Sequence, residues 1–179
     1  DTKYPEGTAE GIYRKIKSGK ENIVLTGMPG SGKSTVGKLL SEKLSRPYLD
    51  VDTLITEKTG KTPAELISAE GEQSFRDVES EVIRSIALET GAVIATGGGA
   101  VLREENRNAL RMNGKIFFLD RPVAQLLPTK DRPLSSTKEA ILQRYHERYD
   151  RYVSTADVVI DNAVSAEEAA QQVERNFLP

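Results

Sequence analysis

The sequence predicts an α/β fold in three layers, with a five-stranded parallel sheet between flanking helices. Five short apolar runs alternate along the chain with longer amphipathic segments, which is the pattern of a parallel sheet wrapped by helices. The first, third and fourth runs are apolar almost throughout, as expected of strands that are covered on both faces. The length of 179 residues and the hydrophobic content of 37% suit one compact domain.

Residues 1–20 precede the first predicted strand and are rich in glycine and lysine. They contain only a short helical pattern, at Ile12, Tyr13 and Ile16. We interpret them as an N-terminal extension or linker, with a tether to a possible upstream fused domain as the alternative. Residues 21–179 then form the folded domain.

Periodicity and turn residues place the remaining elements. Strands are predicted over residues 22–26, 47–50, 92–96, 115–119 and 157–160. Helices are predicted over residues 33–44, 53–58, 63–70, 72–89, 104–112, 123–127, 138–153 and 166–177. The helix at residue 63 begins with a capping box, because Thr62 and Glu65 can each bond a backbone N–H group of the first turn. Residues 128–137 are polar, contain two prolines and show no periodicity, which predicts a loop.

Composition excludes several classes of function. The net charge is −2, so the chain has neither a basic field for nucleic acid nor a cationic face for a membrane. There is no cysteine, which excludes disulfides, thiolate catalysis and sulfur-ligated metals. No apolar stretch approaches the roughly 20 residues of a membrane span, and the start of the chain lacks the apolar core of a signal peptide. We therefore expect a cytoplasmic protein that binds neither nucleic acid nor a membrane.

The stretch GMPGSGKST, residues 27–35, directly follows the first apolar run. It meets the phosphate-loop pattern G-x-x-x-x-G-K-[ST] at Gly27, Gly32, Lys33 and Ser34, with a predicted strand before it and a predicted helix after it. Glycines let backbone N–H groups converge on a phosphate, and the helix adds the positive end of its dipole. Lys33 supplies a point charge for the β- and γ-phosphates, and the Ser34 hydroxyl suits Mg²⁺. A glycine turn without a ligand is the alternative.

Polar and glycine residues follow the second and third strands, at the edge where an open α/β sheet binds its ligand. Asp50 and Asp52 are two apart on an extended segment, so their side chains project to the same side. One suits the water shell of Mg²⁺ and the other a substrate hydroxyl; alternatively, Asp52 caps the next helix and Asp50 is merely solvated. Gly97, Gly98 and Gly99 allow a ligand to approach bare backbone, or form a plain turn.

The charged residues Arg76 and Glu79 can be interpreted in two ways. Arg76 and Glu79 are one helical turn apart. In a crevice Arg76 would present a planar fork to a carboxylate, and on an exposed surface the pair would contribute little to stability.

Asp120 follows the fourth apolar run, and we interpret it as a turn or cap residue because Arg121 and Pro122 come next in place of an acidic residue. The Asn-Lys-x-Asp pattern with which GTPases read their base is absent, so we do not expect a nucleotide switch.

Six motifs in order and spacing, GMPGSGKST, LDVD, FRDVE, TGGGA, DRPLS and ERYDRY, make the chain resemble the shikimate kinase family from about Ile23 to the C-terminus. The resemblance implies a P-loop kinase fold of the nucleoside-monophosphate-kinase type with a mobile lid. It implies transfer of the γ-phosphoryl group of ATP to the 3-hydroxyl of shikimate, with Mg²⁺, in aromatic amino-acid biosynthesis. We expect a monomer or a weak oligomer whose partner is the small molecule shikimate.

The resemblance also implies a role for each matching residue. The residues at the ATP phosphates would be Gly30, Ser31, Gly32, Lys33, Ser34 and Thr35, and those at Mg²⁺ would be Ser34 and Asp50. The residues at shikimate would be Asp52, Arg76, Glu79, Gly97, Gly98, Gly99 and Arg148, with the two arginines on its carboxylate. Arg132 in the lid would close over ATP and stabilise the transferred phosphoryl group. Asp52 would orient or deprotonate the attacking hydroxyl, so the catalytic residues would be Lys33, Asp52 and Arg132.

The chain departs from the family pattern in two places. Asp150, Arg151 and Tyr152 stand where the family has Pro-Leu-Tyr, so Arg151 competes with Arg148 for the carboxylate. Residues 126–129 lack the basic residue that many members place near adenine, which leaves the adenine contacts undefined. Two other functions stay open: a related small-molecule kinase of the gluconate type, and an ATP-binding module that transfers no phosphate.

Overall fold

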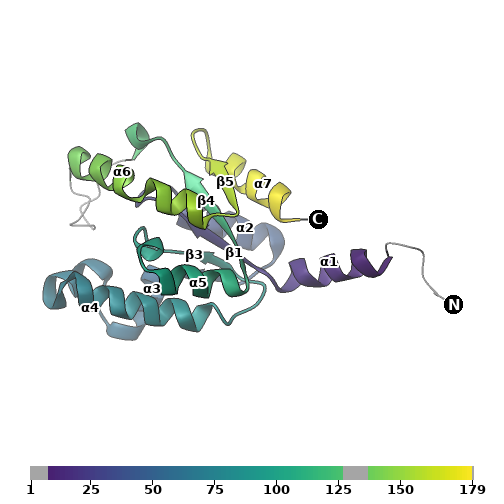
Figure 1. Cartoon of the computed structure of the whole chain (residues 1–179), viewed down its shortest axis with the longest axis horizontal. Helices are drawn as coiled ribbons and strands as arrows, with labels where there is room; N and C mark the ends of the chain where they lie inside the picture. The colour runs from purple at the N-terminus through teal and green to yellow at the C-terminus, as the bar shows by residue number, and fades with distance from the viewer. Residues whose placement is uncertain (1–7, 127–136, 179) are drawn as a thin grey trace.

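The computed structural model describes residues 8–126 and 137–178 of the chain. Its centre is a five-stranded, all-parallel sheet in the order β2-β3-β1-β4-β5 (Figure 1). The strands are β1 (Asn22–Thr26), β2 (Tyr48–Asp50), β3 (Val93–Ala95), β4 (Gly114–Asp120) and β5 (Val158–Asp161). The predicted fold class is therefore confirmed, and all five strands lie where the apolar runs predict them.

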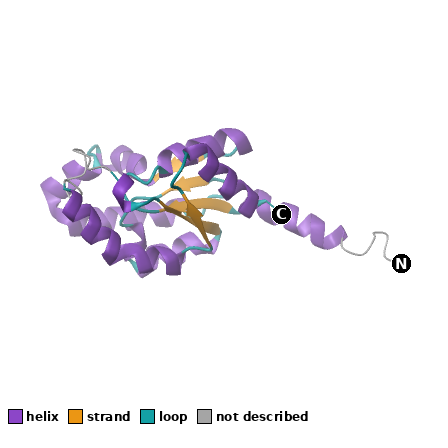
Figure 2. Cartoon of the chain, turned by 90° about the horizontal axis from the view of Figure 1, so that it is seen from above, coloured by secondary structure: helices purple, strands orange, loops and turns teal. Residues whose placement is uncertain are grey.

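Helices cover both faces of the sheet, as the view from above shows (Figure 2). One face carries α2 (Lys33–Leu44) and α7 (Ala166–Phe177). The other face carries α3 (Val51–Thr59), α4 (Pro63–Ile86) and α5 (Glu104–Met112). Successive residues of β1 alternate between the two cores: Ile23 and Leu25 pack with α2 and α7, and Val24 packs with the opposite set. All three side chains are fully buried, as expected of a continuous apolar run in a strand that is covered on both faces.

A third apolar cluster joins α6 (Lys138–Thr155) to the carboxyl edge of the sheet. The rings of Tyr152 on α6 and Phe118 on β4 stack with their centroids 4.9 Å apart. Met28, the second residue of the predicted phosphate loop, belongs to the same cluster. The helix that carries Arg148 is therefore packed directly against that loop.

The predicted helices at residues 63–70 and 72–89 form one element, α4, with a break at Gly71. The φ of Gly71 is 89° and its ψ is 164°, which is not helical and favours glycine. The predicted capping box is present: Thr62 Oγ1 accepts from the N–H of Glu65 at 3.3 Å, and Glu65 Oε2 accepts from the N–H of Thr62 at 2.7 Å. The break lets the part of α4 after Gly71 take its own direction along the sheet.

A helix, α1 (Thr8–Lys20), occupies most of the segment interpreted as a linker. It extends away from the body of the molecule (Figure 1), and Ile12, Tyr13 and Ile16 are more than half exposed. The helix is held at its end, where Lys20 O accepts from the N–H of Gly91 at 2.8 Å. The short helical pattern is thus part of a longer helix, and the division of the chain at residue 20 stays a prediction.

Two short segments differ from the expected secondary structure. Residues Val123–Gln125 form a 3-10 turn, η2, where a helix over residues 123–127 is predicted, and a second 3-10 turn, η1 (Ala100–Leu102), was not predicted. Most of the predicted loop at residues 128–137 lies outside the described residues, and so does Arg132. The loop's last residue, Thr137, caps α6 by accepting from the N–H of Ala140 at 3.1 Å.

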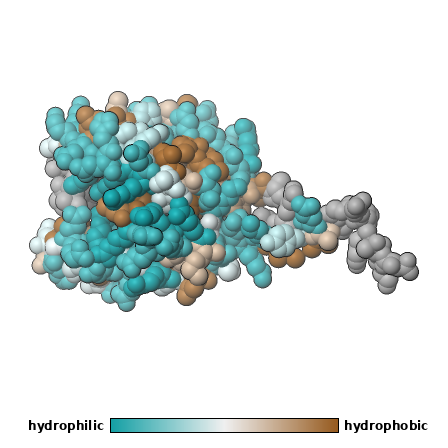
Figure 3. Space-filling view, in the orientation of Figure 1, coloured by the Kyte–Doolittle hydropathy of each residue, from teal (hydrophilic) through white to brown (hydrophobic). Residues whose placement is uncertain are grey.

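The surface is mainly polar. Figure 3 shows hydrophilic residues over most of the face in view, with hydrophobic ones in small areas. Exposed apolar side chains such as Leu88, Met112 and Val164 lie in separate parts of the chain: after α4, at the end of α5 and between β5 and α7. Among residues 8–126 and 137–178, the structure has no helix with the length and apolar character needed to cross a membrane.

Candidate active site

The predicted phosphate loop connects β1 to α2. Gly27, Gly30 and Gly32 have φ angles of 147, 80 and 88°, a region that favours glycine. A Cβ on Gly27 would lie 2.8 Å from Leu119 O, so the loop approaches β4 too closely for a larger residue. The loop ends at the N-terminus of α2, where backbone N–H groups without helical partners attract anions.

Lys33 is the first residue of α2, and its side chain lies over the loop. It is 7% exposed, and its Nζ donates to Gly27 O and to Met28 O, each at 2.8 Å. The ammonium group is a compact charge on a flexible stem, so it can exchange these carbonyl partners for a phosphate. The loop therefore holds a preplaced cation at the predicted anion site.

Ser34 and Asp50 come from different elements and meet at the carboxyl edge of the sheet. Asp50 Oδ2 accepts from Ser34 Oγ at 3.1 Å and from Tyr48 Oη at 2.9 Å. Asp50 Oδ1 accepts from the N–H groups of Asp52 and Thr53, at 3.0 and 3.2 Å, and thereby caps α3. The alternative in which Asp52 caps this helix and Asp50 is merely solvated is therefore wrong.

The residues at this position fit Mg²⁺. A serine hydroxyl and a carboxylate next to a phosphate loop are the oxygen donors that Mg²⁺ prefers. In the described part of the chain, no cluster of three or more carboxylate or histidine side chains could hold a metal on its own. Since Mg²⁺ is usually held by one or two protein groups together with phosphates and water, the Ser34–Asp50 pair is sufficient for it.

Arg76 and Glu79 form a buried ion pair on α4. Arg76 Nη1 bonds Glu79 Oε2 at 2.7 Å, and Nη2 bonds Glu72 Oε1 at 3.3 Å; Arg76 is 8% exposed and Glu79 is fully buried. Burial raises the pKa of Glu79 and Asp52 adds to this, although the charges of Arg76 and Arg148 oppose it. Burial lowers the pKa of Arg76, but its acidic neighbours outweigh burial and raise that pKa overall. The guanidinium therefore stays charged in a site largely closed to water.

The glycines after β3 lie against this ion pair. A Cβ on Gly97 would lie 2.7 Å from Glu79 Oε1 and 3.2 Å from Asp52 Oδ1. A Cβ on Gly99 would overlap the guanidinium of Arg76. At both positions a larger side chain would displace a charged group, so this segment packs closely against the ion pair.

Gly98 faces the phosphate loop, and its carbonyl oxygen has two donors. A Cβ on Gly98 would lie 2.5 Å from Pro29 Cδ. The oxygen accepts from Arg148 Nη1 at 3.1 Å and from the hydroxyl of Tyr152, which also contacts Met28 Sδ at 3.8 Å. Burial raises the pKa of Tyr152 to about 12, so this hydroxyl keeps its proton. Tyr152 thus links the glycine turn to the phosphate loop.

Of the two arginines that competed on sequence grounds, Arg148 is the one that reaches the site. Arg148 is 7% exposed and bonds Gly98, whereas the side chain of Arg151 is exposed on α6. A role of Arg148 toward a carboxylate stays a prediction.

Replacing Tyr152 with phenylalanine is expected to lower the free energy of unfolding by about 1 kcal/mol. The variant loses a buried hydrogen bond but leaves no cavity, and the Gly98 oxygen keeps Arg148 as its donor. Urea unfolding of both proteins measures the difference. A loss above about 3 kcal/mol would contradict this account, because it is the size expected of a buried oxygen left without a donor.

A cavity of about 320 Å³ opens at the phosphate loop. It is lined by Gly30, Gly32, Lys33, Ser34, Thr35, Asp50, Asp52, Thr96 and Arg121. The residues predicted for phosphate, Mg²⁺ and the acceptor hydroxyl therefore share one hollow, and the buried Ser31 lies within the loop itself. Arg132 is not among the residues that the structure describes.

Sequence reasoning missed Arg121 and Asn162 as site residues. Arg121 lines the cavity, and Asn162 Nδ2 donates to Ser31 O at 2.5 Å. Each comes directly after the last residue of a strand at the ligand-binding edge, and this position is the signal that could have found them. Arg103, which donates to Arg76 O at 3.1 Å, carries no comparable signal in the sequence.

The side chain of Asp120, interpreted above as a turn or cap residue, bonds a tyrosine on α6. Asp120 is the last residue of β4, and its Oδ1 accepts from Tyr145 Oη at 3.1 Å. It is not among the residues that line the cavity. Asp120 therefore joins the end of β4 to α6.

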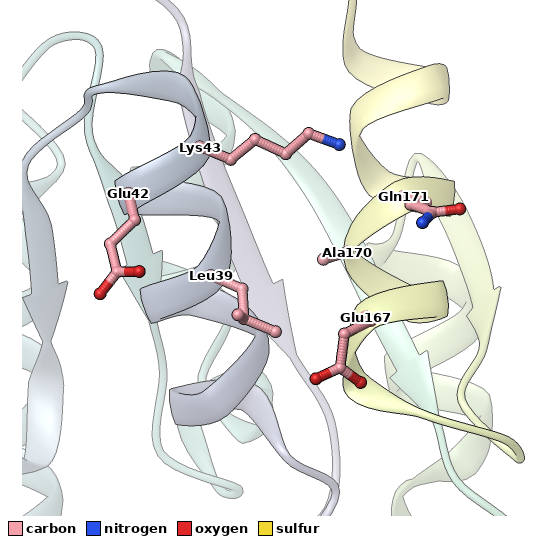
Figure 4. Close-up of a pocket in the computed structure, with 6 residues that line it drawn as sticks. All are labelled: Leu39, Glu42, Lys43, Glu167, Ala170 and Gln171. Carbon is pink, nitrogen blue, oxygen red and sulfur yellow. The ribbon is translucent and has the colours of Figure 1, made fainter.

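A second hollow, of about 460 Å³, lies between α2 and α7 (Figure 4). It is lined by Leu39, Glu42, Lys43, Glu167, Ala170 and Gln171. Lys43 extends toward α7, where it pairs with Glu174, and Glu42 points away from α7. This hollow is larger than the cavity at the phosphate loop, but none of the predicted site residues lines it.

Known protein sequences of one family match this chain over most of its length. A family model described as "Shikimate kinase" matches residues 29–177. A shikimate kinase of Clostridium botulinum is 40% identical over 160 residues, which are 87% of this chain and 96% of the relative. A shikimate kinase of Clostridium beijerinckii is 44% identical over 147 residues, which are 80% of this chain and 86% of the relative.

Solved structures of the same family also match most of the chain. The structure of a shikimate kinase from Acinetobacter baumannii in complex with shikimate matches with a TM-score of 0.86 and 32% identity, covering 92% of this chain and 96% of the other. The structure of a shikimate kinase from Aquifex aeolicus matches with a TM-score of 0.76 and 32% identity, covering 87% of this chain and 95% of the other.

Proposed function

The chain belongs to the shikimate kinase family, and we propose that its crevice brings the γ-phosphoryl group of ATP to the 3-hydroxyl of shikimate. Its activity is that of a shikimate kinase, and the family generally uses ATP with Mg²⁺. One observation carries the assignment of residues to roles. The glycine turn, residues 97–99, contacts the phosphate loop through Gly98. It contacts the Arg76–Glu79 ion pair through Gly97 and Gly99. A phosphate site and an acid-binding site are therefore neighbours.

The phosphate loop and α2 would hold the nucleotide. Backbone N–H groups of residues 30–35 would bond the phosphates, and Lys33 would give up its carbonyl partners to bond the β- and γ-phosphates. Ser34 and Asp50 would hold Mg²⁺, which neutralises phosphate charge when it is bound. Arg132 in the lid would then cover the nucleotide.

On the acceptor side, the protein offers arginine side chains for the carboxylate of the acceptor and an aspartate for its hydroxyl. Arg76 and Arg148 would bind the carboxylate of shikimate, since a planar guanidinium suits that group, and Glu79 would hold Arg76 in place. Asp52 lines the cavity and lies next to Gly97, between the phosphate loop and the ion pair. It would accept the proton of the 3-hydroxyl as that oxygen bonds the γ-phosphorus and the bond to the β–γ bridging oxygen breaks.

The choice of acceptor tests this function. With ATP and Mg²⁺, the protein is expected to release ADP in the presence of shikimate and to form its 3-phosphate ester, which ³¹P and ¹H NMR identify. Matched reactions with gluconate, or without an acceptor, are expected to release ADP at the background rate. Turnover with gluconate alone would assign the chain to another kinase activity. Tight ATP binding without a phosphorylated product at any shikimate concentration would instead indicate a nucleotide-binding module.

A further inference from the structure

Arg121 lies in the cavity without a role in the function described so far. It is the first residue after β4, and it lines the same hollow as Lys33 and Ser34. Its Nη1 lies 3.9 Å from the point that a Cβ on Gly32 would occupy, beside the N-terminus of α2. A guanidinium therefore adjoins the predicted phosphate site from the β4 side.

One donor of the Arg121 guanidinium, its Nε, is buried and has no partner in the described part of the chain. In the same part of the chain no carboxylate forms an ion pair with Arg121. A buried donor without a partner costs free energy, and an anion next to the guanidinium removes that cost.

The strand order shows which end of the nucleotide Arg121 faces. β1 lies between β3 and β4, so residues after β2 and β3 and residues after β4 and β5 lie on opposite sides of the phosphate loop. Asp50, Asp52 and Thr96 are on the first side, where the acceptor and Mg²⁺ are proposed. Arg121 and Asn162 are on the second side, so the phosphates far from the acceptor face Arg121.

We propose that Arg121 binds the phosphate groups that ATP and ADP share, on the side of the phosphate loop away from the acceptor. This inference rests on the proposed function only in taking an adenine nucleotide as the ligand. Arg121 adds affinity for the nucleotide and does not stabilise the group in transfer, which is the task proposed for Lys33 and Arg132.

Calorimetric titration with ADP and Mg²⁺, without shikimate, tests the proposal directly. Arg121→Ala is expected to raise the Kd of ADP at least about tenfold, as expected when a charge-assisted hydrogen bond is lost. Arg121→Lys, which keeps the charge but loses the fork, is expected to lie between the two proteins. Arg175→Ala removes an equal charge from the exposed surface of α7 and is expected to leave Kd within twofold.

Steady-state kinetics and inhibition by adenosine identify which part of the nucleotide Arg121 binds. In Arg121→Ala, the KM of ATP is expected to rise about as much as the Kd of ADP, with kcat within about threefold and the KM of shikimate unchanged. The inhibition constant of adenosine, which has no phosphate, is expected to stay the same. Thermal unfolding of each variant checks that it is folded.

Three results would overturn the proposal. An unchanged Kd of ADP in folded Arg121→Ala, or in Arg121→Lys if the alanine variant does not fold, would show a structural role. Weaker ATP binding with normal ADP binding would place Arg121 at the γ-phosphate, and weaker adenosine inhibition would place it at the base. A protein that binds ADP as expected but does not phosphorylate shikimate would refute the proposed function and leave this inference standing.

Discussion

Replacing Lys33 with methionine is expected to lower kcat by about 10²–10³-fold, because the variant loses a preplaced charge that stabilises the phosphates during transfer. The Nζ of Lys33 is held between two carbonyl oxygens of the loop, so the charge is in place before the nucleotide arrives. The side chain does not contact the proposed carboxylate site, and we therefore expect the Kd of shikimate to change less than about twofold. Steady-state kinetics and calorimetric titration with shikimate measure the two quantities.

Lys38→Met is the matched control for this substitution. Lys38 lies on the same helix and is exposed, so the control removes an equal charge away from the loop. Its kcat is expected to equal that of the unmodified protein. If Lys33→Met keeps more than a tenth of the unmodified kcat while remaining folded, the lysine is not the cation that the transfer depends on.

Replacing Arg76 with alanine is expected to have two effects, one on binding and one on stability. The Kd of shikimate should rise about 10²-fold, since a guanidinium bonded to a carboxylate is lost. The free energy of unfolding should fall by about 3–5 kcal/mol, because Glu79 remains fully buried without its partner. Shikimate titration and urea unfolding measure the two effects separately.

A second substitution separates these effects. Arg76→Ala combined with Glu79→Gln removes the buried charge, so most of the stability should return while shikimate still binds weakly. Arg84→Ala, which removes a largely exposed arginine from the same helix, should change neither quantity. If the double variant regained shikimate affinity, Arg76 would not be the carboxylate ligand.

The stability loss in Arg76→Ala should depend on pH in a definite direction. Burial holds the pKa of Glu79 above its usual value, and removing Arg76 takes away the main opposing charge. A carboxyl whose pKa is higher in the folded than in the unfolded protein favours folding more as pH falls. The deficit should therefore be largest near neutral pH and shrink as pH falls toward the ordinary pKa of glutamate, about 4.3.

The sequence was most informative where a few neighbouring residues determine the geometry. The phosphate loop and the capping box at Thr62 and Glu65 are of this kind, because their bonds join residues only a few positions apart. The strands were predictable because a sheet buried on both faces needs continuous apolar runs. The six motifs added the acceptor residues, which no local pattern connects.

Features that depend on tertiary contacts were missed or misassigned. The sequence offered Asp52 as the cap of α3, and only the folded backbone shows that Asp50 bonds the first N–H groups. Nothing in the local sequence of Tyr152 shows that its hydroxyl donates to Gly98 O, because the two residues are 54 positions apart. The local sequence gives Arg121 no role, and only the folded chain places it in the cavity beside α2.

The two donors on the Gly98 oxygen also bear on how the acid is taken up. If Arg148 turned toward an incoming carboxylate, the Gly98 oxygen would lose the hydrogen bond that Arg148 donates to it. Without a second donor, the cost of that unpaired oxygen would partly cancel the free energy gained from the new bonds. Here the phenol of Tyr152 remains in place as a permanent second donor. Arg148 can therefore change partners at low cost, and the glycine turn keeps its shape whether the site is empty or full.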